Sequence, residues 1–191
     1  MENSYRRGDI MQAALELIAE RGFHAAPMAE IAKQAGVAAG TIYRYFEAKD
    51  ALVSALHREL EDKMSATLRE GYPVERPLRE RFFHLTRKLS QYLIANPHHF
   101  RYMAQYYHSP YGIDDRMYGL SAKPGNQEIF INLFEEGKVQ QILKDLPVVV
   151  LFSLAFAPLI SLIRAHILSF IDLDEALIER TMEACWDAIK L

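Results

Sequence analysis

The stretch GTIYRYFEAK, residues 40–49, concentrates hydrogen-bond donors on a short piece of chain. The donors are one guanidinium, one ammonium and three hydroxyls, carried by Arg44, Lys49, Thr41, Tyr43 and Tyr45. Such groups suit contacts with anionic oxygens and with the polar edges of rings. A catalytic site would show a nucleophile beside a base, a phosphate-binding loop or metal-ligand spacing, and none of these patterns occurs in the sequence. The stretch therefore favours binding over catalysis.

Apolar residues recur at helical spacing in the segments that must position these donors. The spacing predicts a helix from Asp9 to Gly22, a short one from Pro27 to Gly36, a third after GVAAG and a fourth that begins near Ala48. On the third helix, Ile42 and Phe46 share the apolar side. Two short helices joined by a turn at Gly36 form the helix-turn-helix arrangement.

The third helix has the composition that a DNA major groove requires. The groove is about 12 Å wide, so the leading residues must be small and must carry groups that meet base edges. Ala38, Ala39 and Gly40 are small, and Thr41 with Arg44 offers polar groups to the bases. Phosphate contacts fix register without reading sequence, and the candidates for them are Tyr43, Tyr45 and Lys49. A half-exposed face whose rings only cover apolar surface is the competing interpretation.

The segment DIMQAALELIAERGFHAAPMAEIAKQAGVAAGTIYRYFEAKDALVSAL resembles the N-terminal DNA-binding region of TetR-family transcriptional regulators. The resemblance covers about residues 8–56 and rests on IAKQAGV, GTIYRYF and the lysine that follows them in one register. It implies that base edges are contacted by Ala39, Gly40, Thr41 and Arg44, and that phosphates are held by Tyr43, Tyr45 and Lys49. It also implies that Ile42 and Phe46 lie in the core.

Two positions depart from the family pattern. Pro27 stands where the family commonly has threonine, and Ala38 where it commonly has serine, so two hydroxyl contacts or caps are missing. The affinity is therefore expected to depend more on Arg44 and on Arg6 and Arg7, which precede the first helix. A frayed terminus is the alternative for the two arginines.

The remaining two thirds of the chain predict an all-α fold of about nine helices. Further helices are expected over 78–93, 97–107, 126–137 and 175–189, with a loop over 108–126 and no strand. We expect a helix-turn-helix DNA-binding domain over residues 1–50 and a helical effector-binding and dimerisation domain over 51–191.

Residues 146–163 carry no charge, and their length approaches the roughly 18–20 residues that span a bilayer. Pro147, Pro158 and two serines favour a buried helix over a membrane anchor, so no membrane partner is expected. Pairing with a second copy would cover the helix, and two recognition helices about 34 Å apart would meet successive major grooves of a palindrome. The family resemblance implies a homodimer through about 147–170 and 174–190.

Aromatic side chains are dense in the middle of the chain. The resemblance implies an effector cavity there, and a small apolar or aromatic compound is the expected ligand. The candidate lining residues are Phe82, Tyr92, Phe100, Met103, Tyr106, Tyr107, Phe130, Phe134, Phe152 and Phe156. Packing alone is the competing interpretation for about half of these rings.

The composition of the chain bears on its DNA binding, its localisation and its need for a metal or cofactor. The net charge is −3, so any positive DNA-binding patch must come from placement rather than from overall charge. The chain has a single cysteine, Cys185, and no apolar leader, and both features favour the cytoplasm. Its seven histidines show no zinc-site spacing, so no metal is expected, and no cofactor is expected either. The leading hypothesis is a repressor released from a palindromic operator by its effector. The alternatives are a dimeric helical adaptor or small-molecule-binding protein that does not read DNA, and a helical enzyme.

Overall fold

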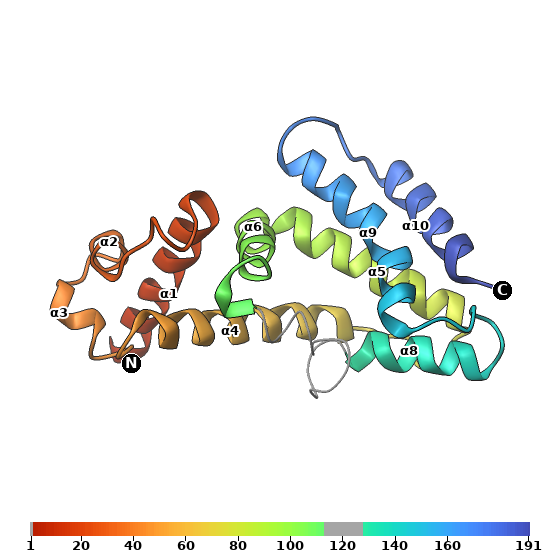
Figure 1. The fold of residues 1–191 in the computed structure, drawn as a ribbon, viewed down its shortest axis with the longest axis horizontal. Helices are drawn as coiled ribbons and strands as arrows, with labels where there is room; N and C mark the ends of the chain where they lie inside the picture. The colour runs from red at the N-terminus through yellow and green to blue at the C-terminus, as the bar shows by residue number, and fades with distance from the viewer. Residues whose placement is uncertain (1, 113–127) are drawn as a thin grey trace. The chain divides into compact units, whose positions relative to one another are not determined.

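The computed structural model describes residues 2–112 and 128–191 of the chain (Figure 1). Within these residues the chain forms nine α-helices and one short 3-10 helix, and the only strand-like pairing there is an isolated bridge between Leu143 and Lys190. The prediction of an all-α fold with about nine helices is confirmed.

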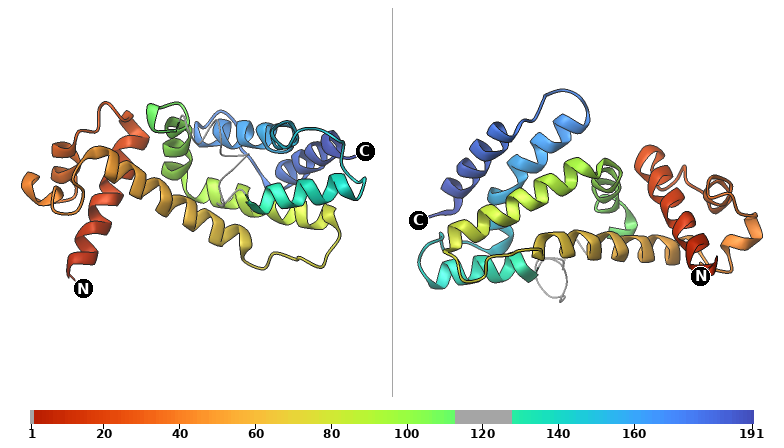
Figure 2. Two further views of the ribbon diagram at one scale, coloured as in Figure 1. Left: turned by 60° about the horizontal axis from the view of Figure 1, so that its bottom comes forward. Right: turned by 180° about the vertical axis from the view of Figure 1, so that it is seen from behind.

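The helices follow one another with short connections. Their bounds are α1 Glu2–Arg21, α2 Met28–Gln34, α3 Ala39–Ile42, α4 Lys49–Arg69, α5 Leu78–Ala95, α6 Pro97–Tyr106, the 3-10 helix η1 Pro110–Gly112, α8 Glu128–Val139, α9 Val148–Ile167 and α10 Glu175–Ile189 (Figures 1 and 2). Most of the loop expected over 108–126 lies outside the described residues, and its described start contains η1.

The chain divides into two compact units. The first contains residues 1–62 and 96–117, and the second contains residues 63–95 and 118–191. The unit that holds the helix-turn-helix is therefore larger than the expected domain of residues 1–50, because the start of α4, α6 and η1 belong to it as well. A division at residue 50 stays a prediction about which part of the chain folds alone.

The first unit has one continuous apolar core. In it α1 packs against α2 and α6, and α2 packs against α3. Tyr102 of α6 is completely buried there, and its hydroxyl donates to the backbone carbonyl of Val53 in α4, 3.2 Å away. The core is formed from all five helices by residues that include Ile10, Ile18, Ile31, Ile42, Phe46, Leu52, Leu56 and Tyr102.

The second unit is built around aromatic rings in T-shaped and tilted contacts. Phe156 of α9 has no exposed surface, and its ring centroid lies 4.9 Å from that of Phe130 in α8 and 6.1 Å from that of Phe82 in α5. Trp186 of α10 also belongs to this cluster, and its ring centroid lies 5.3 Å from that of Phe82. The side chain of Asp174 caps α10 by accepting a hydrogen bond from the Leu177 amide.

Several helix boundaries differ from the sequence-based expectation. α1, for example, begins at Glu2 rather than Asp9. α8 does not stop at Gly137 but runs to Val139. Gly137 is needed inside the helix because a Cβ there would lie 2.5 Å from Leu143 and 2.7 Å from Leu78. The residue marks a close approach of neighbouring side chains, not a helix end.

Candidate nucleic-acid interface

The turn between α2 and α3 is set by Gly36. Its φ of +67° lies in the left-handed region, and the amide of Val37 donates to the carbonyl of Ala32 while that of Gly36 donates to Lys33. These two hydrogen bonds form a Schellman motif, which ends α2 and turns the chain toward α3. Val37 then packs against the core, so the turn holds both helices in place.

Replacement of Gly36 by alanine is expected to lower the free energy of unfolding by about 1 kcal/mol, because only backbone strain opposes the new side chain. A Cβ at this position would meet nothing within 4 Å. Gly8 also has open space around it, but it lies inside α1 and has no positive φ, so Gly8→Ala is expected to stabilise the protein instead. Urea denaturation of both variants measures the difference in sign, and destabilisation by both would contradict it.

Residues 38–45, here called the recognition segment, expose their small and polar residues. Ala38, Ala39, Gly40, Tyr43 and Arg44 are exposed, and Thr41 is partly exposed. Ile42 is completely buried and anchors the segment in the core. Phe46, the residue that follows the segment, is buried in the same core. The predicted division between outward and inward residues is therefore present in the structure.

α3 is shorter than a typical recognition helix. It has helical geometry only over Ala39–Ile42, and hydrogen bonds from the amides of Arg44 and Tyr45 continue it as a turn. Neither α2 nor α3 has a side-chain N-cap, because Pro27 and Ala38 occupy the two capping positions. The segment is held instead by its apolar anchors Ile42 and Phe46. The side chain of Gln34 on α2, the helix before it, donates a hydrogen bond of 2.8 Å to Glu16 on α1.

The two tyrosines differ in exposure. Tyr43 is 55% exposed and extends from the segment, whereas Tyr45 is half-buried and packs against the core of the first unit. Their predicted phosphate contacts remain predictions, and the placement of Tyr43 leaves its ring the more accessible of the two.

Lys49 makes an internal contact that the sequence did not reveal. Its ammonium donates to the backbone carbonyl of Phe23, in the turn between α1 and α2. Burial lowers the pKa of the Lys49 ammonium, and the adjacent Asp50 opposes that shift. One of the three ammonium protons is used in this contact, so any phosphate would be held by the other two.

Arg6 and Arg7 lie inside α1 rather than on an arm in front of it. Both are exposed, and the guanidinium of Arg7 lies 5.4 Å from the centroid of the Phe46 ring and 3.6 Å from the carboxylate of Glu59. Arg7 thus covers the ring that anchors the recognition segment. Phosphate binding by the two arginines remains a prediction.

The predicted effector residues are divided between the two units. Phe100, Met103, Tyr106 and Tyr107 belong to the first unit, and the other six belong to the second. All are buried except Tyr92, Tyr107 and Phe152, which are partly exposed. Their role as an effector pocket remains a prediction, and their visible role is packing.

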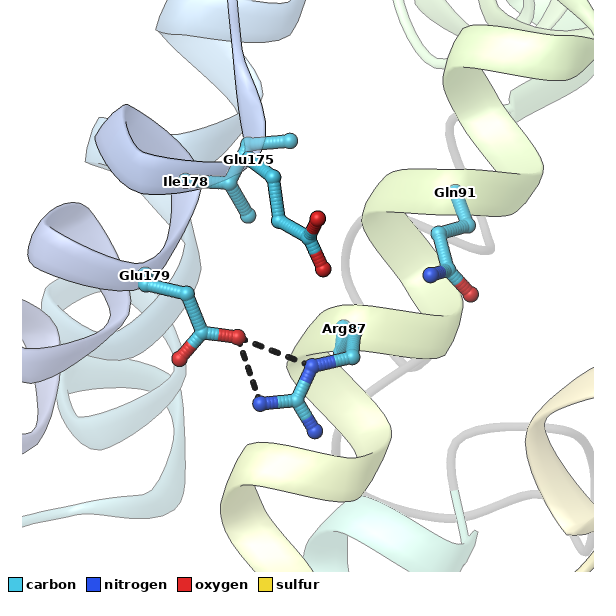
Figure 3. A pocket seen from close by; sticks show the side chains of 5 residues that line it. All are labelled: Arg87, Gln91, Glu175, Ile178 and Glu179. Atoms are coloured by element: carbon cyan, nitrogen blue, oxygen red, sulfur yellow. Dashed lines mark hydrogen bonds and ion pairs between the residues drawn. The ribbon is translucent and has the colours of Figure 1, made fainter.

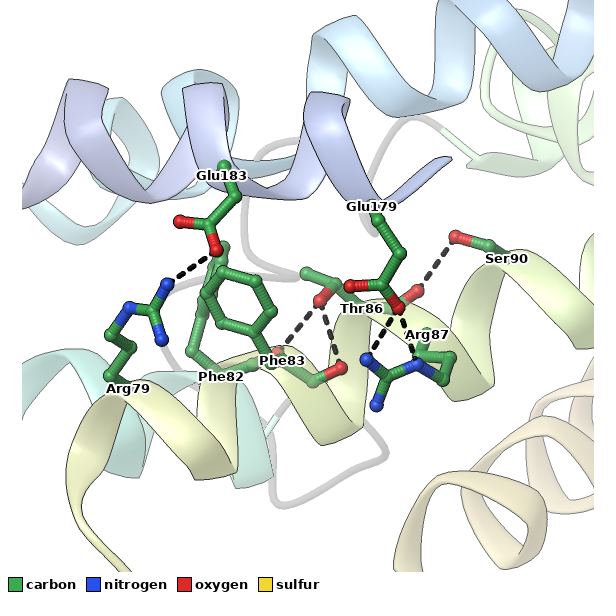
Figure 4. A network of polar contacts seen from close by, with 8 residues as sticks. All are labelled: Arg79, Phe82, Phe83, Thr86, Arg87, Ser90, Glu179 and Glu183. Carbon is green, nitrogen blue, oxygen red and sulfur yellow. Dashed lines mark hydrogen bonds and ion pairs between the residues drawn. The ribbon is translucent and has the colours of Figure 1, made fainter. Parts of the chain in front are cut away.

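A hollow of about 250 Å³ lies between α5 and α10 of the second unit, lined by Arg87, Gln91, Glu175, Ile178 and Glu179 (Figure 3). None of the predicted effector residues lines it. The Arg87 guanidinium donates to Glu179 at 2.9 and 2.5 Å, and Arg79 pairs with Glu183 at 2.5 Å further along the same two helices (Figure 4). Arg79 and Glu183 are exposed, and Arg87 and Glu179 are partly exposed, so solvent screens both pairs and each adds little stability.

Two protein-family models match the chain. One, described as "Bacterial regulatory proteins, tetR family", matches residues 10–56, which contain the helix-turn-helix. The other, described as "Tetracyclin repressor-like, C-terminal domain", matches residues 77–190. The second match alone covers more than half of the chain, and together the two include most of the described residues.

Comparisons with individual proteins give the same result as the family models. An HTH-type transcriptional regulator of Haemophilus influenzae is 28% identical over 183 residues, which is 95% of this chain and 94% of the relative. A solved TetR-family transcriptional regulator from Vibrio parahaemolyticus is 31% identical with a TM-score of 0.77, and the match covers 97% of this chain and 99% of that one. The fatty acid metabolism regulator of Bacillus subtilis is 52% identical, but over 50 residues only, or 26% of each protein.

Proposed function

The chain belongs to the TetR family of bacterial regulatory proteins and is a helix-turn-helix transcriptional regulator, and from that premise we propose that it is a homodimeric repressor. In this proposal the dimer acts in the cytoplasm and binds a palindromic operator. A small apolar or aromatic effector releases it. Arg44 and Thr41 meet base edges beside Ala39 and Gly40, while Tyr43, Tyr45, Lys49, Arg6 and Arg7 hold phosphates.

The outward presentation of Ala39, Gly40 and Arg44 is the observation that carries this proposal. Their exposure follows from the anchoring of Ile42 and Phe46 in the core and from the left-handed turn at Gly36. A small leading edge lets the backbone approach the groove, and a guanidinium beside it can form two hydrogen bonds to a guanine. The net charge of −3 gives little general attraction to DNA, so the cationic groups that hold phosphates must act through their placement beside the recognition segment.

A gel-shift titration with the intergenic DNA beside the protein's own gene tests the proposal. We expect a dimer-sized complex that survives an excess of unrelated DNA. An adaptor that does not read DNA would give no sequence-dependent complex, and that result would overturn the proposal.

α9 supports the dimeric part of the proposal. Among the described residues, α9 is the one helix that is long and apolar enough to cross a membrane. Only 28% of its most apolar stretch of 18 residues is buried within the chain. Leu151, Phe156 and Leu159 point into the core, while Val150, Leu154 and Leu168 are exposed on a stripe with Ala157 and Ser161. A second copy of α9 and α10 placed against this stripe would cover it.

Leu154→Glu is therefore expected to dissociate the dimer, because it places a charge in the apolar contact of both protomers. Each buried leucine contributes about 1.5–3 kcal/mol, so the dimer dissociation constant should rise at least about 100-fold. Analytical ultracentrifugation over a range of concentrations measures it.

Val139→Glu provides the matched control, since Val139 is 82% exposed at the end of α8 and lies outside the stripe. It should leave the dimer intact. Equal dissociation of both variants, or of neither, would contradict the assigned interface. Wild-type protein that sediments with membranes would show instead that lipid covers α9.

The effector part of the proposal is supported by the aromatic cluster of the second unit, where Phe152 is partly exposed at 4.7 Å from Phe156. A ligand releases DNA only if it prefers the state that cannot bind. Apolar and aromatic compounds that raise the melting temperature should therefore also weaken the gel-shift complex. Compounds that stabilise the protein and leave DNA affinity unchanged would contradict release by this route.

A further inference from the structure

Gln105 of α6 contacts the last turn of α1, from which it is distant in sequence. Its side-chain amide donates a hydrogen bond of 3.1 Å to the backbone carbonyl of Ala19. Because α1 ends at Arg21, this carbonyl is one of those that a helix leaves unbonded at its C-terminus. Ala19 is buried, so solvent has little access to the carbonyl, and Gln105 satisfies it in place of water.

The same side chain fits against the residue that turns the chain out of α1. Gly22 has a left-handed φ of +82°, and its amide donates to the carbonyl of Ile18 at 2.9 Å. A Cβ at Gly22 would lie 3.0 Å from the side-chain oxygen of Gln105, a distance at which one of the two has to move. Glycine at this position therefore lets Gln105 lie against the end of the helix.

α6 is a fixed support for Gln105 because two of its tyrosines hold it on α4. Tyr102 and Tyr106 are one helical turn apart on α6, and they meet Val53 and His57, which are one turn apart on α4. The Tyr102 hydroxyl donates to the Val53 carbonyl at 3.2 Å. The Tyr106 ring stacks on the His57 ring with the centroids 3.8 Å apart. Gln105 therefore connects the end of α1 to a helix whose place on α4 is set.

This connection encloses the helix-turn-helix from both sides. On one side the chain runs from Gly22 through the turn into α2, and α2 leads to the recognition segment through Gly36. On the other side the segment continues through Phe46 into α4, on which α6 is held. Because α1 packs against α2, movement of the end of α1 relative to α4 would displace α2 and with it the exposed Arg44.

We propose that Gln105 is a positioning residue for DNA reading, which acts through the Ala19 carbonyl to hold the end of α1 and with it the recognition segment. The proposal rests on the proposed function and adds to it a residue outside the helix-turn-helix sequence. Gln105 touches no DNA in this account. Its effect is geometric, because a hydrogen bond to a base edge weakens when the guanidinium of Arg44 leaves its place.

Gln105→Met tests the proposal because methionine is an unbranched side chain of similar length without a hydrogen-bond donor. With DNA selected from random oligonucleotides by the wild type, the variant should bind about threefold to tenfold more weakly. Gln105→Glu should bind more weakly still, since its carboxylate would face the Ala19 carbonyl and the negative end of the α1 dipole. Fluorescence anisotropy well below the unfolding temperature measures both, so that only folded proteins are compared.

A cycle with Arg44→Ala separates positioning from a purely structural role. If Gln105 acts by placing Arg44, most of the loss caused by Gln105→Met should disappear when Arg44 is already alanine. An equal loss in both backgrounds would overturn the proposal. A purely structural role would lower the unfolding midpoint of Gln105→Met and leave its DNA affinity at the wild-type value, and that result would overturn it too.

Gln140→Met is the matched control, since the Gln140 amide also donates a hydrogen bond, 3.0 Å long, to Glu136 in the second unit. The variant removes the same kind of donor at a position outside the unit that holds the helix-turn-helix. Its DNA affinity should equal that of the wild type. Equal weakening by Gln140→Met and Gln105→Met would contradict the positioning role.

Hydrogen exchange separates this inference from the proposed function. Gln105→Met should speed exchange of the Gly22 amide and of its neighbours at the end of α1, whether or not DNA is present. If the wild type selected no DNA, the proposed function would fail, while this measurement would still decide whether Gln105 holds the end of α1. Unchanged exchange in Gln105→Met would overturn the inference.

Discussion

Arg44→Ala is expected to weaken operator binding by about 30-fold to about 10⁴-fold. A bidentate contact between arginine and guanine contributes about 1–3 kcal/mol of discrimination, and a dimer loses two of them. Arg44 is exposed on the recognition segment, so its removal leaves the core intact. The loss should be largest for the preferred operator and small for unrelated DNA, and fluorescence anisotropy with both duplexes measures it.

Arg58→Ala removes the same charge from an exposed position on α4, outside the recognition segment. Its effect on the preferred operator should be small, and it should not alter the ratio between specific and non-specific affinity. Equal losses for both arginines would show that Arg44 acts only through its charge, and the assigned base contact would then be wrong.

Phe156→Ala is expected to lower the free energy of unfolding by about 3–5 kcal/mol, since it removes a buried ring and leaves a cavity. The ring has no exposed surface and lies within 6.3 Å, between centroids, of four other aromatic rings. Such a loss is a large part of the stability of a typical domain. Urea denaturation at one fixed protomer concentration measures it, because dimer stability depends on concentration.

Phe170→Ala is the matched comparison, because this phenylalanine is 77% exposed in the connection between α9 and α10. Its removal should change the stability of the folded chain by less than about 0.5 kcal/mol. A loss below about 1 kcal/mol for Phe156→Ala would contradict its place at the centre of the aromatic cluster.

The recognition segment could be predicted from sequence because its signals are local. Ile42 and Phe46 are one helical turn apart, so periodicity alone placed both on the inner side, and both are buried. Gly36 was a reliable sign of the turn because glycine adopts a left-handed φ without the steric cost that other residues have there.

Contacts between distant parts of the chain were not predictable in this way. The ammonium of Lys49 contacts the carbonyl of Phe23, and a backbone acceptor leaves no mark in the sequence. The predicted phosphate contact of Lys49 stays a prediction. The ring of Tyr111 lies 5.1 Å from that of Phe23, between centroids, and only the tertiary fold brings these two residues together. Gly137 was predicted to end a helix, but it is a point of close packing inside α8 because of Leu143 and Leu78.

The aromatic residues show the same limit. Helical spacing identified an apolar region but could not separate rings that fill a core from rings that line a cavity. It also omitted Trp186, which packs on Phe82, because this tryptophan lies far along the chain from the other rings. The division of the ten predicted residues between two units depends on the path of the chain, which periodicity does not contain.

Selection of DNA from a random duplex library by the purified full chain tests the central claim most directly. An outward recognition segment on a two-fold dimer predicts an enriched site with two inverted half-sites, whose centres lie about one helical turn or a whole number of turns apart. The same selection with Arg44→Ala should lose preference at one base pair in each half-site. A library that emerges with no enriched sequence, or with a site that Arg44→Ala selects equally well, would contradict DNA reading by this segment.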